Sequence, residues 1–236
     1  DGTLVSFKTH QVPDSAARAL KRVREQGVRL FIATGRHYTD LNNLGDLEFD
    51  GYITLNGQYC YDRRGVIHKQ HIPSEDIRSV LPNIEHDPFG CLFIEEHRMY
   101  LNRMDAQVRI AQDLINFHDP EILPLETALH HDIYQMMAFI GPEREQTRWN
   151  PYFIDIVPRG GSKRIGLDAV IQAYGIELNE TMAFGDGQND SEMLRHAGIG
   201  IAMGNAANEV KQAADYVTSD IDDDGIARAL KHWFDI

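Results

Sequence analysis

The stretch FGDGQND, residues 184–190, follows an apolar run over 181–184 that predicts a short buried strand. Its two glycines let the backbone turn tightly, and Asp186 and Asp190 stand four positions apart ahead of an expected helix. Ligands of open parallel sheets bind at the carboxyl ends of the strands. Carboxylates in such a loop suit Mg²⁺, which takes one or two of them and fills its shell with water and phosphate. An aspartate that caps the next helix would explain Asp190, but not Asp186 together with Asn189.

Two more segments place polar groups at the start of a helix or the end of a strand. At IATGR, residues 32–36, an apolar run ends in the hydroxyl of Thr34, the bare amide of Gly35 and the guanidinium of Arg36. These groups suit an anion, although a threonine cap with a surface arginine explains them equally well. Lys163 opens another expected helix, where a cation is unfavourable unless an anion pairs with it. A merely solvated lysine is the alternative.

The rest of the chain alternates between helix and strand on both sides of a different module. Before the module, the patterns predict helix 14–26, strand 28–33, helix 37–44, and strand 52–55 ending at Asn56-Gly57. After it, from Ser162, the alternation returns and ends in a helix over 224–233. This order predicts an α/β fold with a doubly wound parallel sheet. Residues 73–158 show an α-β-β-α-β-β order instead, so we expect an inserted α+β domain within a core of residues 1–72 and 159–236.

Composition excludes several classes of protein. The 236 residues are 42% hydrophobic and 25% charged, as in globular domains, and the net charge of −13 would repel nucleic acid and anionic membranes. No apolar run reaches the length of a membrane helix, and the first residues lack a signal-peptide pattern. Cys60 and Cys91, far apart and without ligand spacing, are expected to be buried thiols in the reducing cytoplasm. The acidic run 220–224 is interpreted as a solvated loop.

In order and type, four segments resemble the motifs of the haloacid dehalogenase (HAD) superfamily of phosphohydrolases: DGTL at 1–4, IATGR at 32–36, GGSK at 160–163 and FGDGQND at 184–190. The strand that ends in LNG, residues 55–57, adds to this. The resemblance covers nearly the whole chain and is greatest to the Cof-type branch, which carries a large α/β cap between the second and third motifs. Residues 73–158 occupy that place.

The resemblance implies a role for individual residues. Asp1 corresponds to the general acid/base, and Asp1, Asp186 and Asp190 to the metal site, with Asp190 in its outer shell. Thr34 and Lys163 match the residues that hold the transferring phosphoryl group, and the remaining phosphate or substrate contacts are expected from Gly35, Arg36, Asn56 and Asn189. The implied activity is a Mg²⁺-dependent phosphatase that acts on a small phosphorylated metabolite, a sugar phosphate above all, through an aspartyl-phosphate intermediate. The alternatives are a phosphotransferase or mutase that uses the same intermediate, and a non-catalytic phosphometabolite-binding protein.

One departure from the family pattern affects the mechanism. The family nucleophile is an aspartate two positions before Asp1, and neither it nor the strand that should carry it is in the sequence. Because a doubly wound sheet without its central strand would leave buried backbone groups unpaired, we expect the native protein to extend upstream of Asp1.

Within the inserted domain, Glu95-Glu96-His97-Arg98 is predicted to be the polar tip of a hairpin with half-buried flanks over 92–94 and 99–101. These four residues are candidates for reading the substrate. A solvent-exposed tip without such a role is the alternative.

Overall fold

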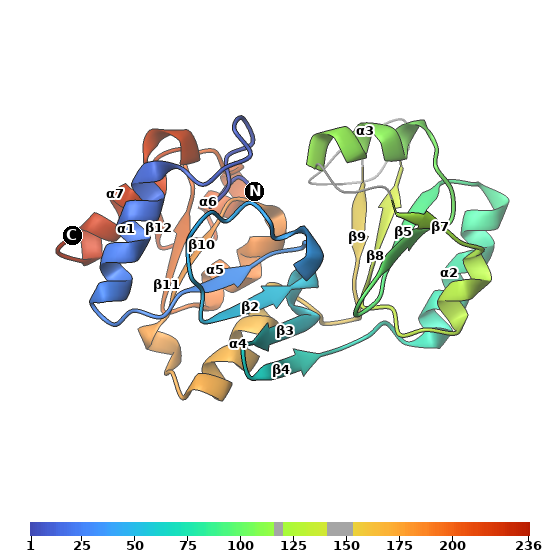
Figure 1. The fold of residues 1–236 in the computed structure, drawn as a ribbon, viewed down its shortest axis with the longest axis horizontal. Coiled ribbons are helices and arrows are strands. Elements are labelled where there is room, and N and C mark those ends of the chain that lie inside the picture. The colour runs from blue at the N-terminus through green and yellow to red at the C-terminus, as the bar shows by residue number, and fades with distance from the viewer. Residues whose placement is uncertain (116–119, 141–152) are drawn as a thin grey trace. The chain divides into compact units, whose positions relative to one another are not determined.

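A computed structural model describes residues 1–115, 120–140 and 153–236 and divides the chain into two compact units (Figure 1). Unit 1 comprises residues 1–68 and 162–236, and unit 2 comprises residues 69–161. The sequence analysis expected the joins after 72 and after 158. The fold is α/β, with a Rossmann-like core and an inserted α+β unit.

The first half of unit 1 builds a four-stranded sheet in the order β1-β2-β3-β4. β1 pairs with β2 in parallel and β2 pairs with β3 in antiparallel, so the end of β2 is a tight turn. The helix α1 begins after Pro13 and ends before Gly27, which has a positive φ of 91°. The bounds are α1 (Asp14–Glu25), β1 (Phe31–Ala33), β2 (Gly51–Thr54), β3 (Tyr59–Asp62) and β4 (Gly65–Lys69).

The second half of unit 1 alternates helix and strand and forms a parallel sheet in the order β10-β11-β12. Nearly every residue of β11 is buried, as expected for a parallel strand covered on both faces. The bounds are α4 (Lys163–Tyr174), β10 (Met182–Gly185), α5 (Ser191–His196), β11 (Ile199–Ala202), α6 (Asn208–Lys211), β12 (Tyr216–Val217) and α7 (Gly225–Trp233).

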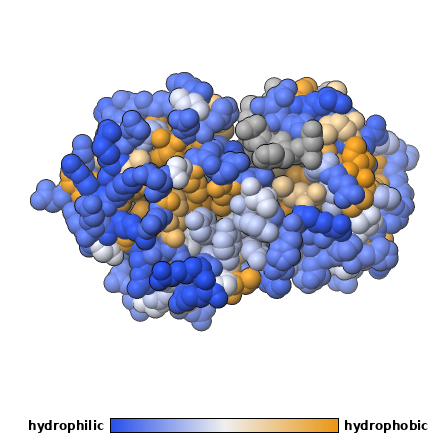
Figure 2. Space-filling model, in the orientation of Figure 1, coloured by the Kyte–Doolittle hydropathy of each residue, from blue (hydrophilic) through white to orange (hydrophobic). Residues whose placement is uncertain are grey.

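The two sheets of unit 1 share one apolar core. Val23 of α1 and Leu230 of α7 pack together with Leu30, just before β1, and with Met182 and Phe184 of β10. On the face that Figure 2 shows, hydrophobic residues gather in the middle of unit 1, over β1 and β10. The described residues form two sheets, because no strand among them pairs with both β1 and β10. The sequence analysis expected a doubly wound sheet whose central strand is not in the sequence, and two separate sheets agree with that expectation.

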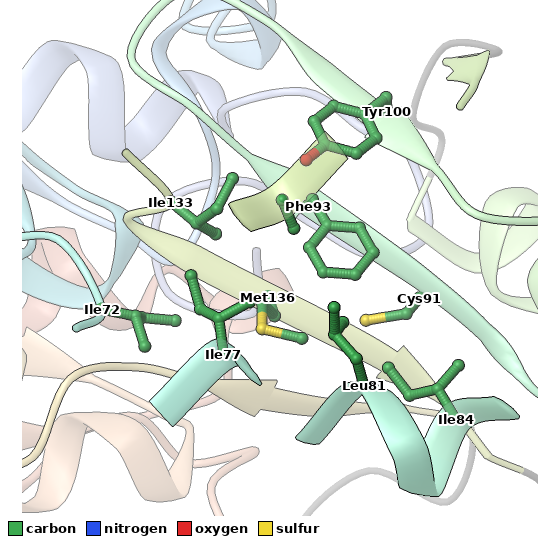
Figure 3. Packing of buried hydrophobic residues seen from close by; sticks show 10 residues of the cluster. Ile72, Ile77, Leu81, Ile84, Cys91, Phe93, Tyr100, Ile133 and Met136 are labelled. Atoms are coloured by element: carbon green, nitrogen blue, oxygen red, sulfur yellow. The ribbon is translucent and has the colours of Figure 1, made fainter. Parts of the chain in front are cut away.

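Unit 2 is a five-stranded sheet in the order β7-β6-β5-β8-β9, with only β6 and β7 parallel. The helix α2 buries Ile77, Leu81 and Ile84 against Phe93 and Met136 of the sheet (Figure 3). Unit 2 therefore has a core of its own. The bounds are α2 (Ser74–His86), β5 (Gly90–Ile94), β6 (Met99–Leu101), α3 (Ala106–Ile115), β7 (Glu121–Ile122), β8 (Gln135–Phe139) and β9 (Ile154–Ile156).

The structure corrects three local expectations. In place of a helix over 37–44 it has a single 3₁₀ turn, Tyr38–Asp40, which the His37 side chain caps by accepting the amide of Thr39. The chain does not continue as a helix, since Asn43 donates to the carbonyl of His10 instead. The acidic run 220–224 is not a merely solvated loop, since Asp222 accepts a hydrogen bond from Ser6. The flanks of the hairpin tip in unit 2 are almost fully buried rather than half-buried, with Met99 the exception.

The expectation of buried thiols is confirmed, as both cysteines are free and buried. Among the described residues, no helix combines the length and the apolar character that crossing a membrane would need.

Candidate active site

All nine residues that the resemblance implies for proton transfer, metal and phosphate lie in unit 1, and contacts join them into one cluster. The four candidates for reading the substrate, residues 95–98, lie in unit 2. Thr34 follows β1, Asn56 follows β2 and Asp186 follows β10, so three strands contribute from their carboxyl ends. The N-terminal loop brings Asp1 and α4 brings Lys163. This is where open parallel sheets bind their ligands.

Asp186 is partly buried and is held by the N-terminal loop. The hydroxyl of Thr3 donates to its Oδ1 at 2.5 Å. Gly2, with a φ of 75°, approaches so closely that any β-carbon at position 2 would overlap the Asp186 carboxylate. Burial raises the pKa of Asp186, although the bond from Thr3 and the charge of Lys163 oppose the rise. A neighbouring cation would relieve this cost.

Asp190 and Lys163 form a buried ion pair. Lys163 Nζ lies 2.6 Å from Asp190 Oδ1, and the side chains are only 7% and 6% exposed. The other oxygen of Asp190 accepts the amides of Asp186 and Gly187 at 3.0 and 2.9 Å. The Asp190 side chain therefore shapes the loop that precedes it and does not cap α5, in contrast to the simple alternative considered from the sequence.

Arg36 binds Asp1 rather than standing free for an anion. Its Nε and Nη2 donate to the two carboxylate oxygens of Asp1 at 2.8 and 2.7 Å, a two-pronged geometry that fixes both planes. The amide of Arg36 also donates to Thr34 Oγ1 at 3.1 Å. That bond uses the threonine oxygen as an acceptor and leaves its hydroxyl proton available for a substrate.

Asn56 and Asn189 connect the loop after β2 to the loop after β10. Asn189 Nδ2 donates to Asn56 Oδ1 at 2.9 Å, and Asn56 adopts a left-handed conformation with a φ of 53°. Gly35 faces the same amide, since a β-carbon there would lie 3.2 Å from both of its terminal atoms. Three loops thus meet at Asn56.

The donor chemistry of the described residues fits magnesium better than a transition metal. They contain no cluster of three or more His, Cys, Asp or Glu side chains with metal-binding geometry. The Asp1 carboxylate accepts hydrogen bonds from Arg36. The Asp190 carboxylate accepts them from Lys163 and from backbone amides. Among the described residues, only Thr3 donates to Asp186, so its Oδ2 can bind an ion. One carboxylate with water and phosphate is a donor set that Mg²⁺ accepts.

Two residues that the sequence analysis did not propose also support the site. Thr3 anchors Asp186, and Asn205 donates to the carbonyl of Gly2 at 2.8 Å while its Oδ1 accepts the amide of Ile221 at 3.0 Å. Asn205 follows β11 closely. The rule that polar residues past strand ends are site candidates could have found it.

Comparisons with known proteins agree with this arrangement. The family model described as haloacid dehalogenase-like hydrolase matches residues 1–230. "Putative phosphatase YkrA" of Bacillus subtilis (strain 168) is 31% identical over 98% of this chain and 94% of its own length. The "HMP-PP phosphatase" of Yersinia pestis (strain Pestoides F) is 29% identical over 99% of this chain and 92% of its own.

Two solved structures are similar over almost the whole chain. The HAD subclass IIB sugar phosphatase BT4131 superposes with a TM-score of 0.92 at 42% identity and covers 99% of this chain and 96% of its own. The phosphatase BT1666 from Bacteroides thetaiotaomicron gives a TM-score of 0.88 at 36% identity, over 98% and 91% of the two chains. The chain belongs to the haloacid dehalogenase-like hydrolases, and within them to the Cof-type phosphatases.

Proposed function

We propose that this phosphatase depends on Mg²⁺ and hydrolyses a small sugar phosphate through an aspartyl-phosphate intermediate. The observation that carries the proposal is Asp186, a partly buried carboxylate with one oxygen available, beside the buried pair of Lys163 and Asp190. The similarity to a protein named a sugar phosphatase supports the substrate class.

In this proposal Asp186 is the carboxylate that holds Mg²⁺, and Asp190 acts on the metal site indirectly through the loop that it shapes. The bound ion would supply positive charge against the phosphoryl oxygens.

Lys163 and Thr34 hold the phosphoryl group. Lys163 has three N–H donors, of which the pair with Asp190 uses one, and Thr34 keeps its hydroxyl proton. Both therefore have donors left for phosphate oxygens, and their charge and dipole stabilise the phosphoryl group as it transfers. Gly35, Asn56 and Asn189 line the same loops and are proposed to complete the phosphate and substrate contacts.

Asp1 moves the proton. Its side chain is oriented by Arg36. In its protonated form it would give its proton to the leaving oxygen, and the carboxylate that results would take one from the attacking water. By the family resemblance, the nucleophilic carboxylate belongs two positions before Asp1, outside residues 1–236. Arg36 is then a positioning residue for Asp1 rather than a direct substrate contact.

The test is phosphate release by the full chain that the gene encodes. We expect hydrolysis of p-nitrophenyl phosphate that stops with EDTA and returns with Mg²⁺, and faster turnover of hexose or pentose phosphates than of nucleotides. A substrate panel that includes nucleotides and pyrophosphates tests the substrate class. Phosphate release that is equal with and without a divalent ion would contradict the metal role, and preference for a non-sugar phosphate would contradict the substrate class.

A further inference from the structure

We propose that Phe7 determines specificity in this phosphatase: its exposed ring contacts a flat apolar face on the organic part of the substrate, such as an aryl ring or the C–H face of a sugar. The inference rests on the proposed function and assigns one side chain of unit 1 to the part of the substrate that the phosphate-binding residues do not touch.

Phe7 is the only aromatic side chain among the large hydrophobic residues that stand exposed in the described parts of the chain. Its side chain is 53% exposed, and the others in this class are Val66, Ile110, Ile122 and Val217. A single exposed hydrophobic residue is common and needs no explanation by itself. The position of Phe7 is what distinguishes it.

The ring lies next to the candidate active site. A β-carbon at Gly2 would lie 2.8 Å from Cε2 of Phe7 and would also overlap the carboxylate of Asp186. The edge of the ring and the proposed metal-binding carboxylate therefore meet at the same glycine. A phosphate bound to a cation at Asp186 would place the rest of the molecule within reach of an aromatic side chain on this loop.

The loop that carries Phe7 is held firmly in place. This loop, residues 2–11, is the darkest blue segment beside the N-terminus in Figure 1. Ser6 is buried, donates to Asp222 at 2.7 Å, and accepts the amides of Lys8 and Thr9. Lys8 pairs with the same Asp222 carboxylate at 2.8 Å.

Further bonds fix the loop at its Gly2 end. The amide of Gly2 donates to the carbonyl of Val5 at 2.8 Å, and Asn205 holds the carbonyl of Gly2. The ring is thus presented by a preorganised backbone, so a ligand that packs on it would lose little entropy in ordering the loop.

The chemistry of the ring complements that of its neighbours. Asp186, Lys163 and Thr34 offer charge and hydrogen bonds, which suit phosphate and metal but do not distinguish one organic group from another. An aromatic ring offers a flat, apolar and rigid surface, and it packs well against other rings and C–H faces.

The test measures kcat and KM of the full chain with Mg²⁺ on two substrates that differ in the organic part. p-Nitrophenyl phosphate carries an aryl ring, whereas acetyl phosphate carries only a small acyl group. We expect Phe7→Ala to lower kcat/KM for p-nitrophenyl phosphate about 3- to 10-fold, mainly by raising KM. The kcat/KM for acetyl phosphate should change less than about 2-fold. Phe7→Tyr, which keeps the ring, should resemble the wild type.

Two more variants separate recognition from folding. Phe7→Leu keeps apolar bulk beside Gly2 without a flat ring. It should lose the preference for p-nitrophenyl phosphate over acetyl phosphate, and it supplies the test if the alanine variant folds poorly. Val217→Ala is the control: it removes a comparably exposed side chain of β12 in unit 1, 45% exposed. It should leave kcat/KM unchanged on both substrates. Thermal melting of each variant reports its fold.

The outcomes are distinct. If Phe7→Ala lowered kcat/KM equally on both substrates, or changed it on neither, the role of Phe7 would be overturned. The phosphatase activity of the wild type would still stand. A wild-type chain that hydrolyses neither substrate with any divalent ion would overturn the proposed function, and this inference with it.

Discussion

Asp186 is a carboxylate held where its charge is disfavoured. Burial raises its pKa, so the folded protein bears a cost for the ionised form at neutral pH. Such a cost is typical of functional sites, where stability is given up for charge that a ligand later neutralises.

Asp186→Asn should therefore separate function from stability. We expect turnover to fall by about two orders of magnitude or more, because phosphoryl transfer depends on the metal charge. In EDTA at pH 7 the variant should melt at a higher temperature than the wild type, because the neutral amide removes the cost of the buried charge. Steady-state kinetics over a Mg²⁺ titration and thermal melting check the two effects. Wild-type turnover at low Mg²⁺ would remove Asp186 from the metal site.

Lys163 and Asp190 differ from Asp186, because each buried charge is offset by the opposite charge of its partner. Removing one partner leaves an uncompensated buried charge, which costs about 3–5 kcal/mol. We expect Lys163→Met to lower the free energy of unfolding by that amount and to abolish turnover, and Lys163→Met/Asp190→Leu to recover much of the stability but none of the activity. Urea unfolding of the single and double variants measures the coupling. A double variant that is less stable than Lys163→Met would show that Asp190 acts mainly through the loop amides.

At the scale of elements, α4 is placed by a glycine. Gly166 lies in its second turn, and a β-carbon there would overlap Ile53 of β2 and lie 3.0 Å from Cα of Gly57. Alanine is favoured over glycine in a helix by about 1 kcal/mol, but overpacking a tight contact costs about 1–3 kcal/mol.

We therefore expect Gly166→Ala to destabilise the protein, against the helix propensity, and to lower turnover because α4 carries Lys163. Urea unfolding should show a loss of about 1–2 kcal/mol. The exposed Gln172→Ala on the same helix is the control and should change stability by less than about 0.5 kcal/mol. A Gly166→Ala variant that is more stable than the wild type would mean that the helix moves away from the sheet at little cost.

Asp62 joins β3 to α4. Its side chain is 1% exposed and accepts from Arg64 Nε and from the hydroxyl of Tyr174, both at 2.8 Å. Burial alone would raise the pKa of Asp62, but these bonds outweigh burial and lower it to about 2. Because the folded pKa is lower than the unfolded value of about 3.9, this stabilisation is present above pH 4 and is lost as the pH falls toward 2.

Asp62→Asn should therefore have a lower melting temperature than the wild type at pH 7. The difference between the two melting temperatures should narrow between pH 4 and pH 2. Melting temperatures measured across that range check the slope. Asp46→Asn is the control, because its exposed pair with Lys21 should contribute little at any pH. A gap that stays constant down to pH 2 would mean that Asp62 stabilises by packing and not by its charge.

Sequence patterns predicted the elements better than their ends. The strands that end in IATGR and FGDGQND were predictable, because apolar β-branched runs stop at glycines. The helix over 37–44 was not, since Asn43 donates to the carbonyl of His10, a partner 33 residues away. The short helix α6 stops at Lys211 for a similar reason, since Asp215 exchanges hydrogen bonds with Gly200 of β11, a partner 15 residues away.

The same limit applies to the site. The motifs indicated which residues gather, because strand ends and helix starts can be read locally. They did not indicate that Arg36 pairs with Asp1, or Lys163 with Asp190, since those contacts span 35 and 27 positions and depend on how the sheets pack.

At the scale of the whole molecule, the residues proposed for the chemistry belong to one of the two units. Every residue proposed for metal, phosphate and proton transfer lies in unit 1, and unit 2 has its own sheet and its own core. Because none of the residues proposed for the chemistry lies in unit 2, we predict that unit 2 adds substrate selection. Glu95 and Arg98, joined in a two-pronged pair at the tip of the β5–β6 hairpin, remain candidates for that role.

Deleting residues 69–161 and joining His68 to Ser162 with a short glycine-serine linker tests this division. We expect KM for sugar phosphates to rise 10-fold or more, because the binding energy from the organic part is lost, while acetyl phosphate hydrolysis falls only a few-fold. Kinetics on both substrates, with circular dichroism and melting to show that unit 1 remains folded, provide the measurement. If a folded variant lost both activities equally, unit 2 would be needed to complete the catalytic site and not merely to choose the substrate.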